Sequence, residues 1–246
     1  MTEECVRLDG HPLMLCTQGE GGPVIYWGTA CGQEAMIREA ASLLSERTPG
    51  LSWTLAAYGM PRWNHDYSPW PSPAVFRGES FTGGARDTLD WLRQVLIPYA
   101  EGTRGMGGGM RMTAGYSLSG LFSLYALYEC ALFDGSAACS PSLWYPGWEA
   151  YMNGRTPAKP CAVCLSLGRT EERTRNRTMA AVGDAVRAQA QRLAGCPMVK
   201  RSELVWHPGG HFAQNELRMA HGLAWLVRHA ACREDAEEST NKEGIL

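Results

Sequence analysis

The sequence contains no apolar run that approaches the roughly 18 residues needed to cross a bilayer, which argues against an integral membrane protein. Its first residues, MTEECVRLDG, include acidic side chains and lack the apolar segment of a secretory signal peptide. We therefore expect a cytoplasmic protein with no membrane as a partner.

An excess of one charge sign is also missing. The chain has 23 basic and 25 acidic residues, a formal net charge of −2 and a sequence pI of about 6.3. Such a balance provides no general attraction for a polyanion, so we expect no nucleic acid partner. The length of 246 residues and the hydrophobic content of 45% fit one globular domain.

Motifs for a metal or a cofactor are absent. The only CxxC joins Cys161 and Cys164 in an apolar, strand-like run, where residues three apart point to opposite faces. In HPGGH, the proline and two glycines prevent a helical pairing of His207 with His211, and there is no HExxH. We expect no metal, no cofactor and reduced thiols for the 9 cysteines.

What the sequence does contain is a regular alternation of short apolar runs and amphipathic segments. Strands are expected at Pro23–Gly28, Ser52–Gly59, Met110–Gly115, Gly135–Ala138, Cys161–Leu167 and Ser202–Trp206. Helices are expected at Gln33–Glu46, Arg86–Ala100, Ser119–Cys130, Thr178–Ala194 and Gln214–His229.

This order predicts an α/β fold in which helices cover both faces of a mainly parallel central sheet. We expect residues 1–232 to form the single domain. Residues 233–246, REDAEESTNKEGIL, are charged and poor in apolar side chains, which favours a disordered tail.

Parallel sheets place their chemistry at the carboxyl ends of the strands, so reactive side chains are expected directly after the predicted strands. Ser117 lies in GYSLSG, between a predicted strand and a predicted helix. This arrangement is typical of a nucleophile elbow, a tight turn that requires small neighbours such as Gly115 and Gly120. The alternative is a buried turn serine without a chemical role.

A serine nucleophile needs a base and an acid. His211 follows the strand that ends at Trp206, where this topology requires the base; His207 is the alternative. Glu171 follows the strand that ends at Leu167, where the acid is expected; Glu172 is its alternative. The chain order of serine, acid and histidine is that of the α/β-hydrolases.

The oxyanion of such an enzyme requires two backbone N–H groups. The first is that of Leu118, directly after the nucleophile. The second is expected just past the first predicted strand, at Thr29 or Ala30.

At these residues the chain resembles the esterase branch of the α/β-hydrolases that includes esterase D, enterobactin-esterase-like enzymes and feruloyl esterase modules. The resemblance extends from about Val24 to Val227 and depends on AGYSLSGLFSLYAL, SPSLWYPGW, LSLGRTEE and PGGHF. It implies the α/β-hydrolase fold, with Ser117, Glu171 and His211 as nucleophile, acid and base. Ser119 differs from the glycine common at that position, and Glu171 from the aspartate of many relatives.

We therefore predict a serine carboxylic ester hydrolase that forms an acyl-enzyme on a small acyl or aryl ester. Aromatic side chains in two loops are the candidates for substrate binding: Trp63, Tyr67, Trp70, Trp144 and Tyr145. The arginines of residues 169–177 form either a solvated basic face or a site for an anionic substrate group. An acyltransferase and a catalytically silent binding protein are the alternatives. The oligomeric state stays open, with a homodimer as one option.

Overall fold

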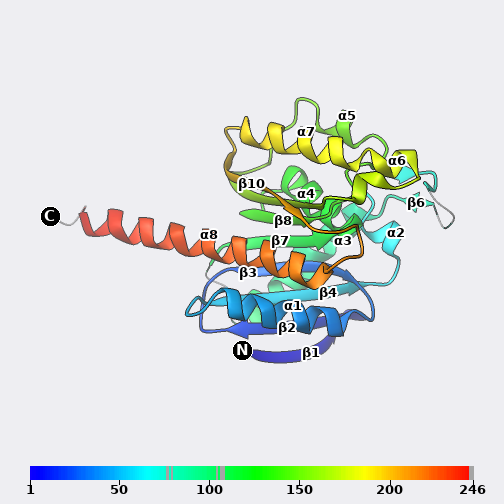
Figure 1. Cartoon of the computed structure of the whole chain (residues 1–246). Helices are drawn as coiled ribbons and strands as arrows, with labels where there is room; N and C mark the ends of the chain where they lie inside the picture. Colours follow the sequence, from blue (N-terminus) through cyan, green and yellow to red (C-terminus); the bar gives the residue numbers. More distant parts are fainter. Residues whose placement is uncertain (76–77, 79, 104, 106–108, 244–246) are drawn as a thin grey trace.

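The computed structural model of the chain has one eight-stranded sheet at its centre (Figure 1). The structure describes all residues except 76–77, 79, 104, 106–108 and 244–246. The strand order is β1-β2-β4-β3-β7-β8-β9-β10. Strand β2 is antiparallel to both neighbours, and the other neighbouring pairs are parallel. The strands are β1 (Thr2–Leu8), β2 (His11–Gln18), β3 (Val24–Ala30), β4 (Trp53–Met60), β7 (Arg111–Tyr116), β8 (Gly135–Cys139), β9 (Cys161–Gly168) and β10 (Val199–His207).

The six predicted strands are all present, but the sequence did not predict the hairpin of β1 and β2. Its turn is Asp9–Gly10, and both residues have positive φ, at 50° and 81°. Asp-Gly is typical of such two-residue hairpin turns. The exposed side chains of β1 make this edge strand too polar to stand out as an apolar run.

Helices cover both faces of the sheet, as predicted. On one face, α1 (Glu34–Arg47) and α8 (Asn215–Glu243) lie side by side. On the other face lie α3 (Ala85–Trp91), α4 (Leu118–Glu129) and α7 (Val182–Ala194). Short elements connect them: α2 (Trp63–Asp66), β5 (Pro71–Ser72), β6 (Phe81–Thr82), α5 (Trp148–Met152), the 3₁₀ turn η3 (Glu171–Arg173) and α6 (Arg177–Ala180).

The two faces of the sheet enclose two separate hydrophobic cores. In β9, Cys161, Val163 and Leu165 belong to the core under α4 and α7, whereas Cys164 belongs to the core under α1 and α8. The CxxC cysteines therefore point to opposite faces, as the strand period predicted. All nine cysteines are free thiols in the structure. Burying a large apolar side chain in these cores stabilises the fold by about 1.5–3 kcal/mol.

Two predicted helices differ in the structure. The helix expected over Arg86–Ala100 becomes α3 followed by the wider turns η1 (Leu92–Leu96) and η2 (Pro98–Thr103), because Pro98 cannot donate the regular helical hydrogen bond. The last helix continues to Glu243, through most of the segment for which composition predicts a disordered tail (Figure 1). The last three residues of that segment, 244–246, lie outside the described residues.

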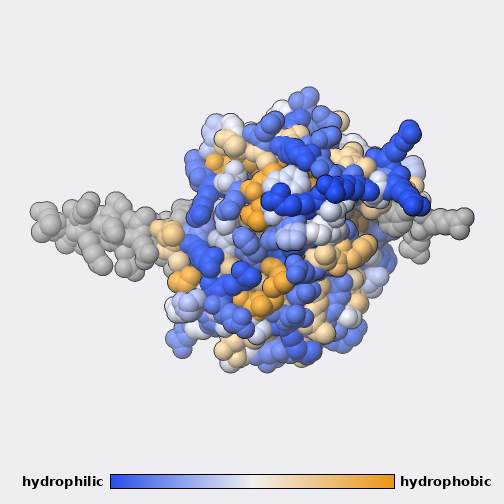
Figure 2. Space-filling view, in the orientation of Figure 1, coloured by the Kyte–Doolittle hydropathy of each residue, from blue (hydrophilic) through white to orange (hydrophobic). Residues whose placement is uncertain are grey.

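The visible face of the molecule mixes hydrophilic and apolar residues, with hydrophilic ones predominating (Figure 2). Within the described part of the chain, no helix has the length and apolar character that a membrane span requires.

Candidate active site

Ser117 occupies a strained turn between β7 and α4. Its backbone has φ +61° and ψ −121°, a conformation that residues other than glycine rarely adopt. The neighbouring glycines make this turn possible. A Cβ at Gly115 would lie 2.2 Å from the carbonyl oxygen of Ser119, and one at Gly120 would lie 3.1 Å from that of Cys139. The strand, sharp turn and helix are the features of a nucleophile elbow.

Ser119, at the position where the resemblance to the esterases leads us to expect glycine, stabilises this turn from within. Its buried hydroxyl accepts a hydrogen bond from the N–H of Tyr116 at 2.9 Å and donates to the carbonyl oxygen of Tyr116 at 2.9 Å. The extra hydroxyl is thus used by the backbone of the elbow.

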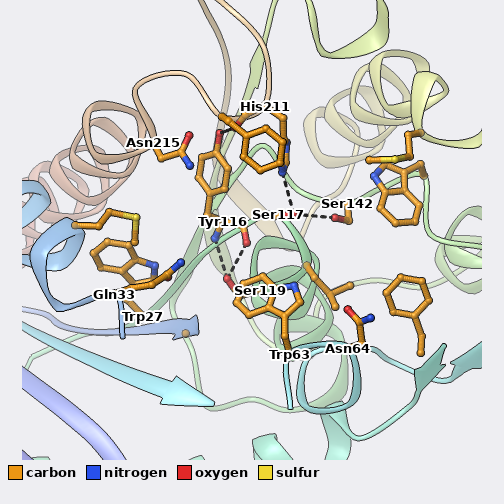
Figure 3. Close-up of a pocket in the computed structure, with 17 residues that line it drawn as sticks. Trp27, Gln33, Trp63, Asn64, Tyr116, Ser117, Ser119, Ser142, His211 and Asn215 are labelled. Atoms are coloured by element: carbon orange, nitrogen blue, oxygen red, sulfur yellow. Dashed lines mark hydrogen bonds between the residues drawn. The ribbon is translucent and has the colours of Figure 1, made fainter. Parts of the chain in front are cut away.

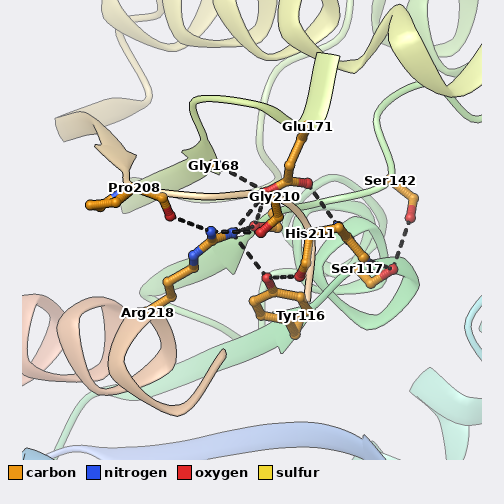
Figure 4. Close-up of polar contacts among 10 residues, drawn as sticks. Tyr116, Ser117, Ser142, Gly168, Glu171, Pro208, Gly210, His211 and Arg218 are labelled. Carbon is orange, nitrogen blue, oxygen red and sulfur yellow. Dashed lines mark hydrogen bonds and ion pairs between the residues drawn. The ribbon is translucent and has the colours of Figure 1, made fainter. Parts of the chain in front are cut away.

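The structure brings Ser117, His211 and Glu171 into one hydrogen-bonded line (Figure 4). The Nε2 atom of His211 lies 3.0 Å from the Ser117 hydroxyl oxygen, and its Nδ1 atom lies 2.7 Å from Oε2 of Glu171. These residues follow β7, β10 and β9, and the carboxyl ends of these parallel strands meet at one edge of the sheet.

The alternative acid and base lie elsewhere. The carboxylate of Glu172 pairs with Arg187 on the surface at 3.0 Å. The ring of His207 lies 5.4 Å from that of His221. Burial, together with the charges of His221 and Arg218, lowers the pKa of His207 to about 4. Neither residue touches Ser117 in the structure.

The buried carboxylate of Glu171 is surrounded by hydrogen-bond donors. Its residue is 8% exposed, and its Oε1 atom accepts hydrogen bonds from Gly168 N–H at 2.7 Å, the Ser140 hydroxyl at 2.8 Å and Arg218 at 2.8 Å. Burial by itself would raise the pKa of Glu171, but the hydrogen bond and charge of His211 and the bonds from Gly168 and Ser140 outweigh it, so this pKa is lowered. The carboxylate is therefore ionised at neutral pH.

Sequence reasoning missed two residues of this network. The Ser142 hydroxyl oxygen lies 3.3 Å from the Ser117 hydroxyl oxygen (Figure 3). The backbone N–H of Ser142 donates to the Ser117 carbonyl oxygen at 3.0 Å. The buried guanidinium of Arg218 contacts Glu171. Arg218 could have been noticed in the sequence, because it is an arginine among the apolar residues of the last predicted helix.

The line of three residues ends in a pocket of about 350 Å³ around Ser117 (Figure 3). Its apolar wall includes Trp27, Met36, Trp63, Phe81, Trp144, Met179 and Phe212. Its polar wall includes Gln33, Asn64, Ser142 and Asn215. The aromatic ring of Phe212, next to His211, is 89% exposed at the mouth.

Of the five aromatic residues proposed for substrate binding, the structure brings only Trp63 and Trp144 to this pocket. Tyr67 is fully buried, and its hydroxyl donates to the Thr29 carbonyl oxygen at 2.9 Å.

The other two aromatic residues of that set pack against each other. Tyr145 is 2% exposed and donates its hydroxyl hydrogen to the Trp70 carbonyl oxygen at 2.6 Å. The ring of Trp70 packs on Trp148 and Tyr151, and its N–H donates to Pro146. All three side chains outside the pocket therefore connect the loops to the core.

The backbone around the candidate oxyanion site is partly occupied. Leu118, the first residue of α4, lines the pocket. Near the end of β3 the pocket is lined by Gly28, and Thr29 and Ala30 follow it in the chain. The N–H of Ala30 lies on the β7 side of β3, as that of Val24 does, and donates to the Gln33 side chain at 3.3 Å, whereas the alternation of the strand turns the N–H of Thr29 toward β4.

The arginines of residues 169–177 do not line this pocket. Arg169 and Arg173 instead line a separate depression on the surface with Glu172, Arg187 and Trp206. The guanidinium of Arg187 lies 5.0 Å above the ring of Trp206. The segment is thus part of a basic surface beside the acid loop.

The fold and the site together define a serine hydrolase of the α/β-hydrolase superfamily. A model of the family described as Putative esterase matches residues 11–221, most of the chain, so the chain belongs to this family. Membership supports ester hydrolysis as the general reaction. Among proteins with curated descriptions, none matches this chain in sequence.

Solved structures have the same fold. An IroE-like serine hydrolase from Shewanella oneidensis has a TM-score of 0.79 at 19% identity, over 92% of this chain and 80% of that one. The siderophore hydrolase EstA from Aspergillus nidulans has a TM-score of 0.72 at 18% identity, over 93% of this chain and 94% of that one. The enterobactin esterase FES from Shigella flexneri has a TM-score of 0.60 at 16% identity, over 92% of this chain and 58% of that one.

Proposed function

We propose that the protein hydrolyses carboxylic esters through an acyl-enzyme, with Ser117 as nucleophile, His211 as base and Glu171 as acid. The observation that supports this best is the pair of contacts of His211, at 3.0 Å to the Ser117 hydroxyl and 2.7 Å to the carboxylate of Glu171. A serine hydroxyl at rest is a weak nucleophile, and such a base activates it.

The proposed reaction begins when the Ser117 oxygen attacks the ester carbonyl while His211 Nε2 takes the hydroxyl proton. Glu171, which is ionised, stabilises the imidazolium and fixes the ring through Nδ1. His211 then gives the proton to the leaving alcohol. Water repeats the sequence on the acyl-enzyme and releases the acid.

The negative oxygen of the tetrahedral intermediate requires N–H donors. We propose Leu118 as the first and Ala30 as the second, because the N–H of Ala30 lies on the side of β3 that faces β7 and Ser117, and its bond to the Gln33 side chain is long, at 3.3 Å. Each such donor stabilises the transition state by about 3 kcal/mol. Trp63 and Trp144, which line the pocket, are the proposed contacts for an acyl or aryl group.

An acyltransferase would use the same three residues with an alcohol in place of water. The silent binding protein is the weaker alternative, because the hydrogen-bonded line from Ser117 to Glu171 is complete. The structural neighbours EstA and FES are a siderophore hydrolase and an enterobactin esterase, so esters of that kind belong in a substrate screen.

A fluorophosphonate probe tests the proposal directly. We expect the wild-type protein to be labelled on Ser117, and labelling to be absent in Ser117→Ala and retained in Ser42→Ala, which changes an exposed serine of α1. An unlabelled wild type, or equal labelling of Ser117→Ala, would contradict the proposal. Product analysis with and without an added alcohol then separates hydrolysis from transfer.

A further inference from the structure

The wall of the pocket around Ser117 has no Lys, Arg, Asp or Glu among the described residues, although Arg169 and Arg173 lie in the neighbouring acid loop. Polar groups are supplied instead by carboxamides, including Asn215, whose Oδ1 atom is buried without a hydrogen-bond partner. The nearby Arg169 and Arg173 open onto a different depression.

A charged substrate group that entered this pocket would lose water and gain no counter-charge. Burial of an unpaired ion is strongly unfavourable, whereas an apolar group gains from contact with the aromatic wall. From this wall we infer that the substrate is an uncharged ester on both its acyl and its alcohol side. The inference rests on the proposed function and narrows it.

Two matched pairs of esters test the inference. On the acyl side, 4-nitrophenyl butyrate is compared with 4-nitrophenyl hemisuccinate, which has the same leaving group and a terminal carboxylate. On the alcohol side, 3,3-dimethylbutyl acetate is compared with acetylcholine. We expect kcat/KM to favour the neutral member of each pair by about tenfold or more.

A variant sharpens the test. Met179→Lys adds a cation to the pocket wall and is expected to raise kcat/KM for the hemisuccinate relative to the butyrate. Asn153→Lys adds the same charge at an exposed position away from the pocket and is the matched control. Preference of the wild type for a charged ester, or equal effects of both variants, would overturn the inference. Fluorophosphonate labelling of Ser117 in the same samples shows whether the proposed function itself holds.

A second observation concerns Arg218, whose basic side chain is the most deeply buried in the part of the chain that the structure describes. The Arg218 side chain on α8 is 1% exposed. Its Nη1 atom donates to Glu171 Oε1 at 2.8 Å, to the Ser140 hydroxyl at 3.0 Å and to the Tyr116 hydroxyl at 3.1 Å (Figure 4). The guanidinium therefore touches the carboxylate on the oxygen that His211 does not use.

The other end of the guanidinium holds the loop that precedes His211. Its Nη2 atom donates to the carbonyl oxygens of Pro208 at 2.9 Å and Gly210 at 2.7 Å. The Tyr116 hydroxyl, which accepts from Nη1, donates to the carbonyl oxygen of His211. One side chain thus joins the acid, the loop of the base and the strand before the nucleophile.

We propose that Arg218 is a positioning residue that fixes the distance between Glu171 and His211 and balances the carboxylate charge. The planar fork of arginine reaches five acceptors on both sides, which the single ammonium of lysine cannot do. A displacement of about 1 Å at a catalytic group costs about 10²-fold in rate.

The groups that surround Arg218 leave Glu171 as its only charged partner near neutral pH. Burial raises the pKa of Tyr116 to about 12 and that of Cys139 to about 12. Burial and neighbouring positive charges lower the pKa of His207 to about 4. A change in the pH profile between pH 5 and 9 would therefore not come from these three groups.

Kinetics of Arg218→Lys and Arg218→Met test the proposal. We expect Arg218→Lys to lower kcat by about 10–100-fold with little change in KM, because Arg218 does not line the pocket. In Arg218→Met the unbalanced carboxylate of Glu171 favours the imidazolium form of His211. The acid limb of the kcat/KM profile then moves to higher pH.

Arg111→Lys is the matched control, since Arg111 makes a two-pronged, partly buried pair with Glu101 at 2.6 and 2.7 Å, at the opposite end of β7 from Ser117. If Arg218→Met does not fold, Arg218→Lys alone decides. Equal loss of kcat in Arg218→Lys and Arg111→Lys, or an acid limb that stays in place in a folded Arg218→Met, would overturn the proposal.

Discussion

Replacement of Ser117 by alanine is expected to lower kcat for ester hydrolysis by about 10⁴-fold or more, with KM changed far less. The hydroxyl forms the bond to the acyl carbon, so its loss removes the covalent route, while the pocket wall that binds the ester stays in place. The residual rate reflects the oxyanion donors and binding alone. Steady-state hydrolysis of 4-nitrophenyl butyrate measures the effect.

The combination with a second change makes this result specific. Because Ser117 and His211 act as one unit, Ser117→Ala/His211→Ala should be no slower than Ser117→Ala. His207→Gln is the control for the histidine, because the His207 ring lies beside His221 and not beside Ser117. Additive losses in the double variant, or an effect of His207→Gln as large as that of His211→Ala, would show that another base operates.

Glu171→Gln is expected to produce the second largest effect, a fall in kcat of about 10⁴-fold. A neutral amide can neither stabilise the imidazolium nor fix the tautomer that presents Nε2 to Ser117. The same change leaves the buried Arg218 without its counter-charge, so the free energy of unfolding should fall by about 3–5 kcal/mol. Hydrolysis rates and chemical denaturation measure the two effects.

The control for this prediction is Glu172→Gln, which alters the adjacent surface carboxylate paired with Arg187. A surface pair contributes about 0–1 kcal/mol, so both activity and stability should stay near the wild type. The prediction fails if Glu172→Gln matches Glu171→Gln, because the acid would then be misassigned.

The lowered pKa of Glu171 gives this prediction a pH signature. A carboxyl whose pKa is lowered by folding stabilises the folded state above its unfolded pKa, here near 4.5, and loses that contribution as pH falls through the lower folded value. Stability of the wild type should therefore decline below about pH 4.5, and Glu171→Gln should decline less steeply there. Parallel declines in both proteins would contradict this assignment.

Much of the fold followed from local patterns. The six predicted strands and most helices show apolar periodicity in the sequence, because their apolar side chains are the ones buried in the two cores. Strand β1 escaped prediction because an edge strand needs only one partner and can remain polar. Strand β2 is an inner strand with a buried apolar run over Leu13–Cys16, which was missed in the sequence. The turns after α3 depended on Pro98 and on packing, which a pattern of apolar residues does not encode.

The candidate site divides in the same way. Ser117, His211 and Glu171 could be selected from the sequence because each follows a strand, and parallel strands end at the same edge. The roles of the aromatic residues could not be selected in this way. Trp63 and Tyr67 lie close together in the sequence. The Tyr67 hydroxyl is hydrogen-bonded to Thr29 in the core, whereas the Trp63 ring lines the pocket.

The sequence by itself determined the order of strands and helices, the elbow at Ser117 and the candidates for base and acid, since these depend on neighbours along the chain. Only the tertiary structure placed Glu171, and not Glu172, against His211, placed Ser142 beside Ser117 and enclosed Arg218 among five acceptors. The physical reason is that hydrogen-bond geometry and burial depend on residues far apart in the sequence, such as Arg218 and Tyr116, which only the folded chain brings together.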